Sequence, residues 1–541
     1  MVAASQQPPD SGSVYAAERI EALARNANGR PVRVGIVSMY DVENNAVRIL
    51  AGTLREGGHH VAEIYFKDWI SNHLDPATDE ELASLVKVIQ DEQLDLVCVS
   101  IRASAYYNAA KILTDHLHET LDIAVLWGGM HPTLVGDTCI QTADLLLQGE
   151  GELALLDLCN RVRDAGVDGA DLIGGTKNVW TQTRSGVRKN ALRGLVENLD
   201  DLSWRDYHSH NHKYFIWGDR IIKGDPMHGD PVFQMMGSRG CIYKCSYCYN
   251  STYKKDVYPG QKWFRVRSPD SMIEEILQAK SHWDFKRIRF DDEVFNFQSD
   301  WVTEFAEKYP KRVGLPFEIF IEPKLVNEER MTQLRDAGLV SVYMGVQSSE
   351  RVTGHLYDRR VKNNTIGDIA QLYHKLGVKP HFQLIFDDPV SSDEDRRKLF
   401  EMISTFPHPF DLYLFSMTVF PGSELNHKLL ESGLISEYDI EGIGTKTFYQ
   451  HRVNLEYPRP VEETYWIAMI QLLSKSFVPK AMLTPLSKSE LLKKHPWPLI
   501  QMAHAANWVK MGTTAAQMAK DGEMTHTLLR RWLSFDRVIT T

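Results

Sequence analysis

The sequence predicts an α/β protein with two separate series of alternating strands and helices, followed by a mostly helical region. Three observations lead to this prediction. Short apolar runs have the length of buried strands, segments with helical spacing separate them, and 541 residues are too many for one hydrophobic core. The composition, 43% hydrophobic and 24% charged, is typical of a globular protein. The net charge of −10 argues against nucleic-acid binding, which requires a basic face.

The first series is expected over residues 31–165, after a loose polar leader at residues 1–30. Strand-like apolar runs and helical segments alternate strictly, which predicts a parallel sheet wrapped by helices, as in Rossmann-like domains. The strands are expected at 32–41, 60–66, 94–101 and 123–129, and the helices begin near Ala46, Asp79 and Ala105.

Residues 166–230 are expected to form a connector with a hairpin at 180–190. The second series, at 231–425, has six strand and helix units and predicts a partial TIM-like (βα)6 barrel. Its strands are expected at 231–237, 287–292, 316–323, 340–347, 380–388 and 411–420. Residues 426–541 are expected to form a helical C-terminal domain. There, 447–460 is aromatic-rich, and 527–538 is expected to be a core-packed amphipathic helix, with membrane-surface contact as the alternative.

The N-terminus has no basic segment followed by an apolar core, so no secretory signal is expected. No stretch approaches the roughly 20 apolar residues that span a bilayer. Six cysteines in 541 residues do not make a disulfide scaffold. We therefore expect a cytoplasmic protein without a transmembrane segment.

Half of the cysteines lie in the stretch GSRGCIYKCSYCYN, as Cys241, Cys245 and Cys248. Buried structural thiols are one interpretation, although chance rarely places three of six cysteines so close together. A zinc site is a second, with His208, His210 or His212 as further ligands, but no paired knuckle is visible. A [4Fe–4S] cluster held by three thiolates is a third; it explains the odd number, because one iron stays open to a ligand.

The motif CIYKCSYC, with SRG before it and an aromatic residue before the last cysteine, resembles the radical S-adenosylmethionine (SAM) enzymes. RFDDEVF, VYMGVQSSERV, FDDP and FPGSEL, at later strand ends, extend the resemblance. It implies that the open iron chelates SAM, whose reductive cleavage gives a 5′-deoxyadenosyl radical. The SAM-binding residues expected are Tyr247, Asp291, Asp292, Glu293, Glu322, Gln347 and Ser348. Arg265 and Arg267 are the alternatives for a carboxylate, with an ordinary surface role favoured.

Two strand ends of the first series, at Ser100 and at Gly128 with Gly129, resemble the cobalamin-binding domain of B12 enzymes. The B12 mutases carry Asp-x-His-x-x-Gly after the first strand, whereas this chain has SMYDVENN there, without histidine. Cobalamin would then lack a histidine ligand from that loop, as is typical of cobalamin-binding radical SAM enzymes. The other cobalamin-binding residues expected are Tyr40, Asp41, Glu43, Asn44, Asn45, Arg102, Ser104, His131, Gly149, Glu150 and Gly151.

The pairing of the two domains implies three cofactors: a [4Fe–4S] cluster, SAM and cobalamin. In the methyltransferase reaction that the resemblance implies, one SAM methylates the cobalt. A second SAM yields the radical that takes a hydrogen atom from an unactivated carbon, which then receives the methyl group; one branch methylates phosphorus. A non-methylating radical cyclisation, rearrangement or oxidation is the alternative. A carrier or sensor is the non-enzyme alternative. A small-molecule substrate and a flavodoxin-like or ferredoxin-like electron donor are the expected partners.

Overall fold

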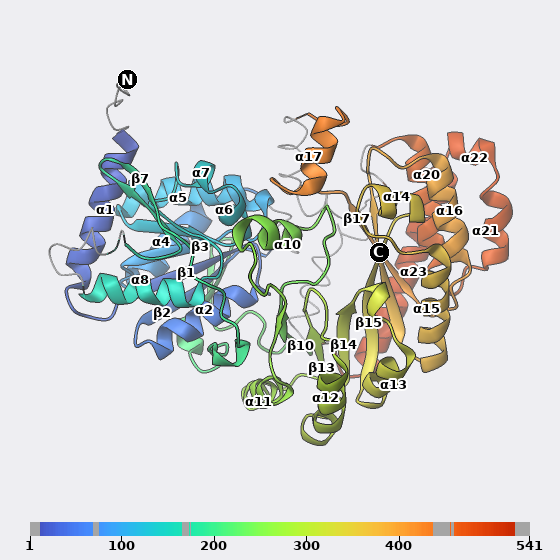
Figure 1. The fold of residues 1–541 in the computed structure, drawn as a ribbon, viewed down its shortest axis with the longest axis horizontal. Helices are drawn as coiled ribbons and strands as arrows, with labels where there is room; N and C mark the ends of the chain where they lie inside the picture. The colour runs from blue at the N-terminus through green and yellow to red at the C-terminus, as the bar shows by residue number, and fades with distance from the viewer. Residues whose placement is uncertain are drawn as a thin grey trace. The chain divides into compact units, whose positions relative to one another are not determined.

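The computed structural model describes residues 11–68, 75–164, 173, 175–436, 455 and 459–524. Two compact units divide the chain: Met1–Val196 with Asp201–His228, and Glu197–Asp200 with Gly229–Thr541. Each unit is built on its own sheet (Figure 1). The predicted α/β class with a Rossmann-like domain and a partial barrel is confirmed.

The sheet of the first unit has the strand order β7-β6-β5-β4-β3-β1-β2-β8-β9. Strands β5, β4, β3, β1, β2 and β8 run parallel, and β6, β7 and β9 pair antiparallel at the two sides. The order reverses between β1 and β3, which is the switch point of a doubly wound sheet. The strands are β1 (Arg33–Met39), β2 (His60–Phe66), β3 (Leu96–Ser100), β4 (Ala124–Gly128), β5 (Leu145–Leu147), β6 (Val179–Thr183), β7 (Gly186–Lys189), β8 (Lys213–Trp217) and β9 (Arg220–Lys223).

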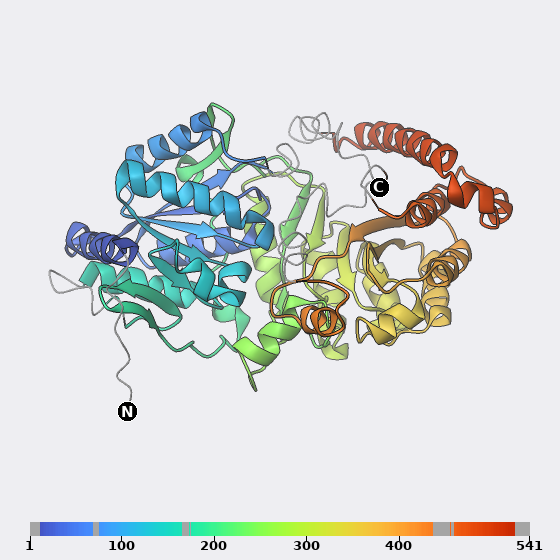
Figure 2. The same cartoon turned by 90° about the horizontal axis from the view of Figure 1, so that it is seen from above.

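Helices cover both faces of this sheet (Figure 2). One face packs against α4 (Asp79–Asp91) and α5 (Tyr107–Leu121), the other against α1 (Ser11–Ala27), α2 (Asn45–Glu56) and α8 (Glu152–Asp164). Capping fixes where the helices begin: Asn44 caps α2, and Thr78 forms a capping box with Glu81 at α4. Because both faces are buried, the central strands read as nearly continuous apolar runs.

Two parts of this unit differ from the prediction. The expected loose leader contains helix α1, whose Ile20, Leu23, Ala24 and Ala27 join the core. The expected connector contributes strands β6 to β9 to the sheet, with the predicted hairpin formed by β6 and β7. A buried ion pair of 2.7 Å between Arg48 of α2 and Asp225 fixes the end of this stretch. Removing one partner of such a pair costs about 3–5 kcal/mol.

The second unit is built on six parallel strands in sequence order, which form an open barrel. They are β10 (Val232–Met235), β13 (Arg287–Phe290), β14 (Phe317–Ile321), β15 (Leu339–Gln347), β16 (Lys379–Phe386) and β17 (Asp411–Ser416). A small ribbon of β11 (Ser238–Arg239) and β12 (Arg265–Val266) follows β10. The helices between the strands are α10 (Tyr249–Thr252), α11 (Pro269–Lys280), α12 (Ser299–Arg312), α13 (Glu328–Asp336), α14 (Glu350–His355), α15 (Asn363–Leu376) and α16 (Asp393–Ser404).

The C-terminal part of this unit is helical, as predicted, with α17 (Glu424–Glu431), α20 (Val461–Leu473), α21 (Lys480–Leu486), α22 (Glu490–Lys494) and α23 (Trp497–Lys520). Arg459 and Glu463 bind Asp387, just after β16, so this region closes on a strand end of the barrel. Most of 447–460 and all of 527–538 lie outside the described residues. Among the helices that the structure describes, none has the length and apolar character needed to cross a membrane.

Candidate active site

The three clustered cysteines line one cavity at the carboxyl ends of the barrel strands. They lie on the loop that follows β10 and β11. Ser246 fixes this loop: its backbone N–H donates to the carbonyl of Tyr357 (3.0 Å) and its hydroxyl to that of Leu356 (2.6 Å). The backbone N–H of Leu425 donates to the carbonyl of Ser246 (2.9 Å). The thiols are thus positioned by chain segments more than a hundred residues away.

Burial raises the pKa of all three thiols, to about 11 for Cys241 and about 12 for Cys248. For Cys245, the nearby Arg359 and Lys324 offset part of this rise in pKa. Metal ligation must remove the protons of the thiols. The other three cysteines, Cys98, Cys139 and Cys159, are buried in the first unit. No histidine is found among the described residues that line the cavity. The described part of the cavity lining therefore offers three sulfurs and no imidazole, and three thiolates suit a cluster that keeps one open iron.

The cavity has a volume of about 350 Å³, the size of a small-molecule site. Six of the seven predicted SAM-binding residues line it, whereas the buried Ser348 does not. Arg265 and Arg267 also do not line it; Arg265 is buried against Trp263, and Arg267 pairs with Glu275 of α11. The six lining residues are Tyr247, Asp291, Asp292, Glu293, Glu322 and Gln347.

Asp292 carries an unsatisfied oxygen at this cavity. Its Oδ1 accepts a hydrogen bond from the Ser238 hydroxyl at 2.5 Å, while Oδ2 is buried without a partner in the described residues. Burial raises the Asp292 pKa to about 7, although the hydrogen bonds from Ser238 lower it. A cationic ligand group would satisfy Oδ2 and favour the ionised form.

Arg359 is a lining residue that the sequence analysis missed. It is 5% exposed, and its Nε lies 3.4 Å from Oε1 of Glu322, while Nη1 has no hydrogen-bond partner in the described residues. Glu322 also accepts a hydrogen bond from the backbone N–H of Lys324 (2.7 Å). The cavity therefore holds a buried cationic donor with unused capacity, matched to a carboxylate.

The backbone of β15 makes room for this arginine. A Cβ atom on Gly345 would lie 2.7 Å from Nη1 of Arg359 and 2.3 Å from Nε2 of Gln347, so a larger residue there would displace the ends of these two side chains. Gln347 has a φ of 71°, next to a register shift between β15 and β16. A left-handed residue other than glycine costs about 1–3 kcal/mol, and such strain gathers at functional sites.

At the first unit's carboxyl edge, the structure joins two of the predicted cobalamin-binding residues across the switch point. Nδ2 of Asn44, after β1, donates to Oγ of Ser100, at the end of β3, over 3.1 Å. Beside them Asp41, buried, pairs with the exposed Arg102 at 2.8 Å. Asn45 accepts a hydrogen bond from Arg205 (2.9 Å). Polar side chains thus gather where doubly wound sheets bind ligands.

Three more of the predicted cobalamin-binding residues, Tyr40, Ser104 and His131, make contacts within the first unit. The ring of Tyr40 is buried against Tyr106, and its hydroxyl donates to the carbonyl of Asp75. His131 is buried with Nδ1 2.9 Å from Oγ of Ser104, and burial lowers its pKa to about 4. The loop after β1 contains no histidine, so this loop offers no imidazole ligand for cobalt.

The glycines at this edge differ in their constraints. Gly129 has a φ of 108°, and a Cβ there would lie 2.8 Å from the carbonyl oxygen of Ile101. Gly128 is unconstrained in the protein, because a Cβ would meet Leu147 at an ordinary 3.5 Å. Gly149 has a φ of 71° and donates its N–H to the Thr133 hydroxyl (3.0 Å). A Cβ on Gly151 would lie 2.9 Å from Leu147. The adjacent Glu150 is half-buried.

Two family models match the two units separately. Residues 235–403 match the radical SAM superfamily, and residues 32–158 match the B12 binding domain. The chain belongs to the cobalamin-binding radical SAM enzymes. Its cofactors are therefore a [4Fe–4S] cluster, SAM and cobalamin.

Relatives of this cobalamin-binding radical SAM enzyme match most of its length. An uncharacterized methyltransferase of Pyrococcus horikoshii is 23% identical over 367 residues, covering 66% of this chain and 74% of the relative. Bacteriochlorophyllide d C-8(2)-methyltransferase of Chlorobaculum tepidum is 22% identical over 366 residues, covering 66% and 72%. The solved structure of OxsB, a cobalamin-dependent SAM radical enzyme, aligns with a TM-score of 0.61 at 14% identity, covering 94% of this chain and 85% of OxsB.

Proposed function

We propose that this enzyme is a methyltransferase that moves a methyl group from SAM to an unactivated carbon, or to phosphorus, of a small-molecule substrate. The observation that carries the proposal is the cavity in which three thiols lie with a buried, partly unpaired arginine and aspartate. The same chain has a B12 binding domain, and its relatives in Pyrococcus and Chlorobaculum are named methyltransferases.

In this proposal the three thiols hold three irons and leave the fourth for SAM. SAM is a zwitterion at its methionine end, and the cavity offers one group for each charge. Nη1 of Arg359 would donate a charge-assisted hydrogen bond to the carboxylate, and Oδ2 of Asp292 would accept one from the ammonium. Both atoms are buried and unpartnered among the described residues, so the ligand removes a desolvation cost that the free protein carries.

The first unit would hold cobalamin along its carboxyl edge. Ser100 and Asn44 are the proposed polar contacts at the switch point, and Gly128, at the end of β4, is the proposed glycine contact. When bound, the cluster with SAM supplies a 5′-deoxyadenosyl radical and cobalamin supplies a methyl carrier. The chain's own task is to bind, to orient and to exclude water. The rings of Phe320 and Tyr343, which stack at 4.6 Å in the cavity wall, serve this exclusion.

A product measurement tests the proposal. The anaerobic protein, reconstituted with iron, sulfide and cobalamin, is incubated with SAM and a strong reductant, and its products are quantified by mass. S-adenosylhomocysteine together with 5′-deoxyadenosine supports methyl transfer. 5′-Deoxyadenosine alone supports the non-methylating alternative, a radical cyclisation, rearrangement or oxidation. The absence of both products identifies a carrier or sensor.

The reaction also needs an external electron donor, because cleavage of SAM consumes one electron. A flavodoxin-like or ferredoxin-like protein is the proposed donor. We propose a cytoplasmic location, because the three cavity thiols, which are free and partly exposed, must remain reduced to take up iron.

A further inference from the structure

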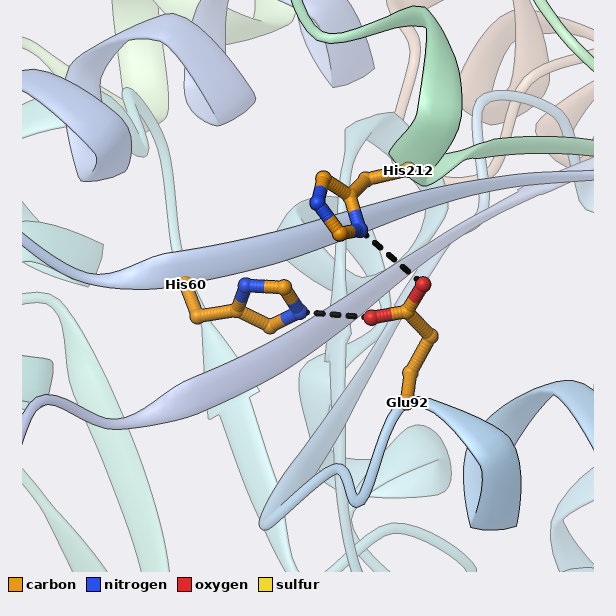
Figure 3. A group of neighbouring side chains, drawn as sticks. All are labelled: His60, Glu92 and His212. Carbon is orange, nitrogen blue, oxygen red and sulfur yellow. Dashed lines mark hydrogen bonds and ion pairs between the residues drawn. The ribbon is translucent and has the colours of Figure 1, made fainter.

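Three potential metal ligands meet at the amino edge of the first unit's sheet, away from the strand ends that carry Ser100 and Gly128. His60 opens β2, His212 lies directly before β8, and Glu92 follows α4. Both imidazoles point at the Glu92 carboxylate, each toward a different oxygen (Figure 3). The distances are 2.7 Å from Nε2 of His60 to Oε2 and 3.0 Å from Nδ1 of His212 to Oε1.

The geometry suits a small dication. One donor atom from each residue lies within 4.8 Å of the other two. In a tetrahedral zinc site with bonds of about 2.0–2.2 Å, ligand atoms are about 3.3–3.5 Å apart. The nitrogen-to-oxygen distances of 2.7 and 3.0 Å must therefore open by about 0.3 to 0.8 Å. His212 is 43% exposed at its side chain, which gives it freedom to move and gives the ion a path from solvent.

Neighbouring side chains hold Glu92 in place through hydrogen bonds, as is usual for residues that bind a metal ion. Tyr214 of β8 donates its hydroxyl to Oε1 of Glu92, and Nε of Arg33 donates to the Glu92 backbone carbonyl (2.7 Å). Such outer contacts orient a carboxylate before the ion arrives. Because a carboxylate has no proton to give, each imidazole now donates its N–H to it. Each neutral imidazole can bind a metal ion once its proton moves to the other ring nitrogen. This change of tautomer releases no proton to solvent.

One feature opposes the ion. The guanidinium of Arg33 lies 3.7 Å from Oε2 of Glu92 and offsets part of its negative charge. Two histidines and one carboxylate nevertheless form a recognised zinc ligand set, and this combination favours zinc over magnesium or calcium. We therefore expect the three residues to bind zinc more weakly than a thiolate site does, but more tightly than an exposed carboxylate does.

We infer that His60, Glu92 and His212 form a zinc-binding site with one position left for water. The site joins the starts of two neighbouring strands, β2 and β8, to the end of α4. An ion there ties residues 210–217, which lie far along the chain, to the body of the first sheet. Its role is structural, since it lies at the sheet edge opposite to the switch-point residues.

The test is a zinc titration of the full chain. The cluster is first reconstituted with iron and sulfide, so that the cavity thiols are occupied, and bound zinc and iron are then counted after desalting. The variants are His212→Gln and, as a second ligand change, His60→Gln. His208→Gln is the matched control, because His208 is exposed on the same segment and is not one of the three ligands. The melting temperature is measured with and without zinc.

We expect one zinc per chain in the wild type and in His208→Gln, with a zinc-dependent rise in melting temperature. Both ligand variants should lose at least about tenfold in affinity and the rise in melting temperature, with unchanged iron content and SAM cleavage. Wild type without stoichiometric zinc overturns the inference. So does zinc that persists in both ligand variants but disappears when all three cavity cysteines are replaced by alanine. Because the iron and SAM readouts are separate, failure here leaves the proposed function untouched.

Discussion

Replacing Arg359 by lysine tests the proposed SAM site most directly. In the structure, Nε of Arg359 pairs with Glu322 and Nη1 has no hydrogen-bond partner among the described residues. A lysine has a single ammonium group, which the buried Glu322 carboxylate will retain. The variant then lacks the second donor for the SAM carboxylate. A hydrogen bond to a charged group contributes about 1.5–3 kcal/mol, so SAM should bind about 10- to 150-fold more weakly.

The assay is equilibrium dialysis of SAM against the reconstituted protein without reductant, so that SAM stays intact. Iron and sulfide are counted in the same samples and should equal those of the wild type. Arg360→Lys is the matched control, because Arg360 is the neighbouring residue and its side chain is 83% exposed. It should bind SAM like the wild type. An Arg359→Lys protein with a complete cluster and SAM affinity within twofold of the wild type would refute the role given to Nη1.

Three further predictions follow from the two units. Alanine at Cys241, Cys245 or Cys248 should abolish the brown colour and SAM cleavage, since two thiolates cannot hold the cluster. A variant that keeps both colour and activity would contradict the assignment. Gly128→Ala and Ser100→Ala should weaken cobalamin binding at unchanged iron content, and unchanged affinity in both would mean that another part of the unit binds the cofactor. Near pH 4, the cofactor-free Asp292→Asn variant should have the same melting temperature as the wild type. At pH values above 7, the variant should melt at a higher temperature than the wild type. The folded-state pKa of Asp292, about 7, exceeds the ordinary 3.8, so wild-type stability falls as the pH rises from about 4 to 7. A difference in melting temperature between variant and wild type that does not change with pH would contradict this raised pKa.

Much of the fold could be predicted from local pattern. The apolar runs of the central strands, such as β2 and β3, and the capping signal of α4 depend on neighbours in the sequence alone. Helix α1 differs from the predicted loose leader, because Ile20, Leu23, Ala24 and Ala27, which have helical spacing among polar residues, become buried only by packing into the core of the first unit. Strand β8 could not be predicted as part of the first sheet, because its partner β2 lies about 150 residues earlier in the chain.

For the site, the sequence alone determined the three thiols, the acidic end of β13 and the glycines at the end of β4, because each is a motif within a few residues. The tertiary structure alone decided that Arg359 reaches Glu322, that Asn44 meets Ser100, and that His60, Glu92 and His212 converge. The physical reason is the separation along the chain between the residues that interact. Strand and helix periods record each residue's immediate surroundings, whereas a buried ion pair or a cluster of ligands forms between side chains that only the packing of distant elements brings within bonding distance.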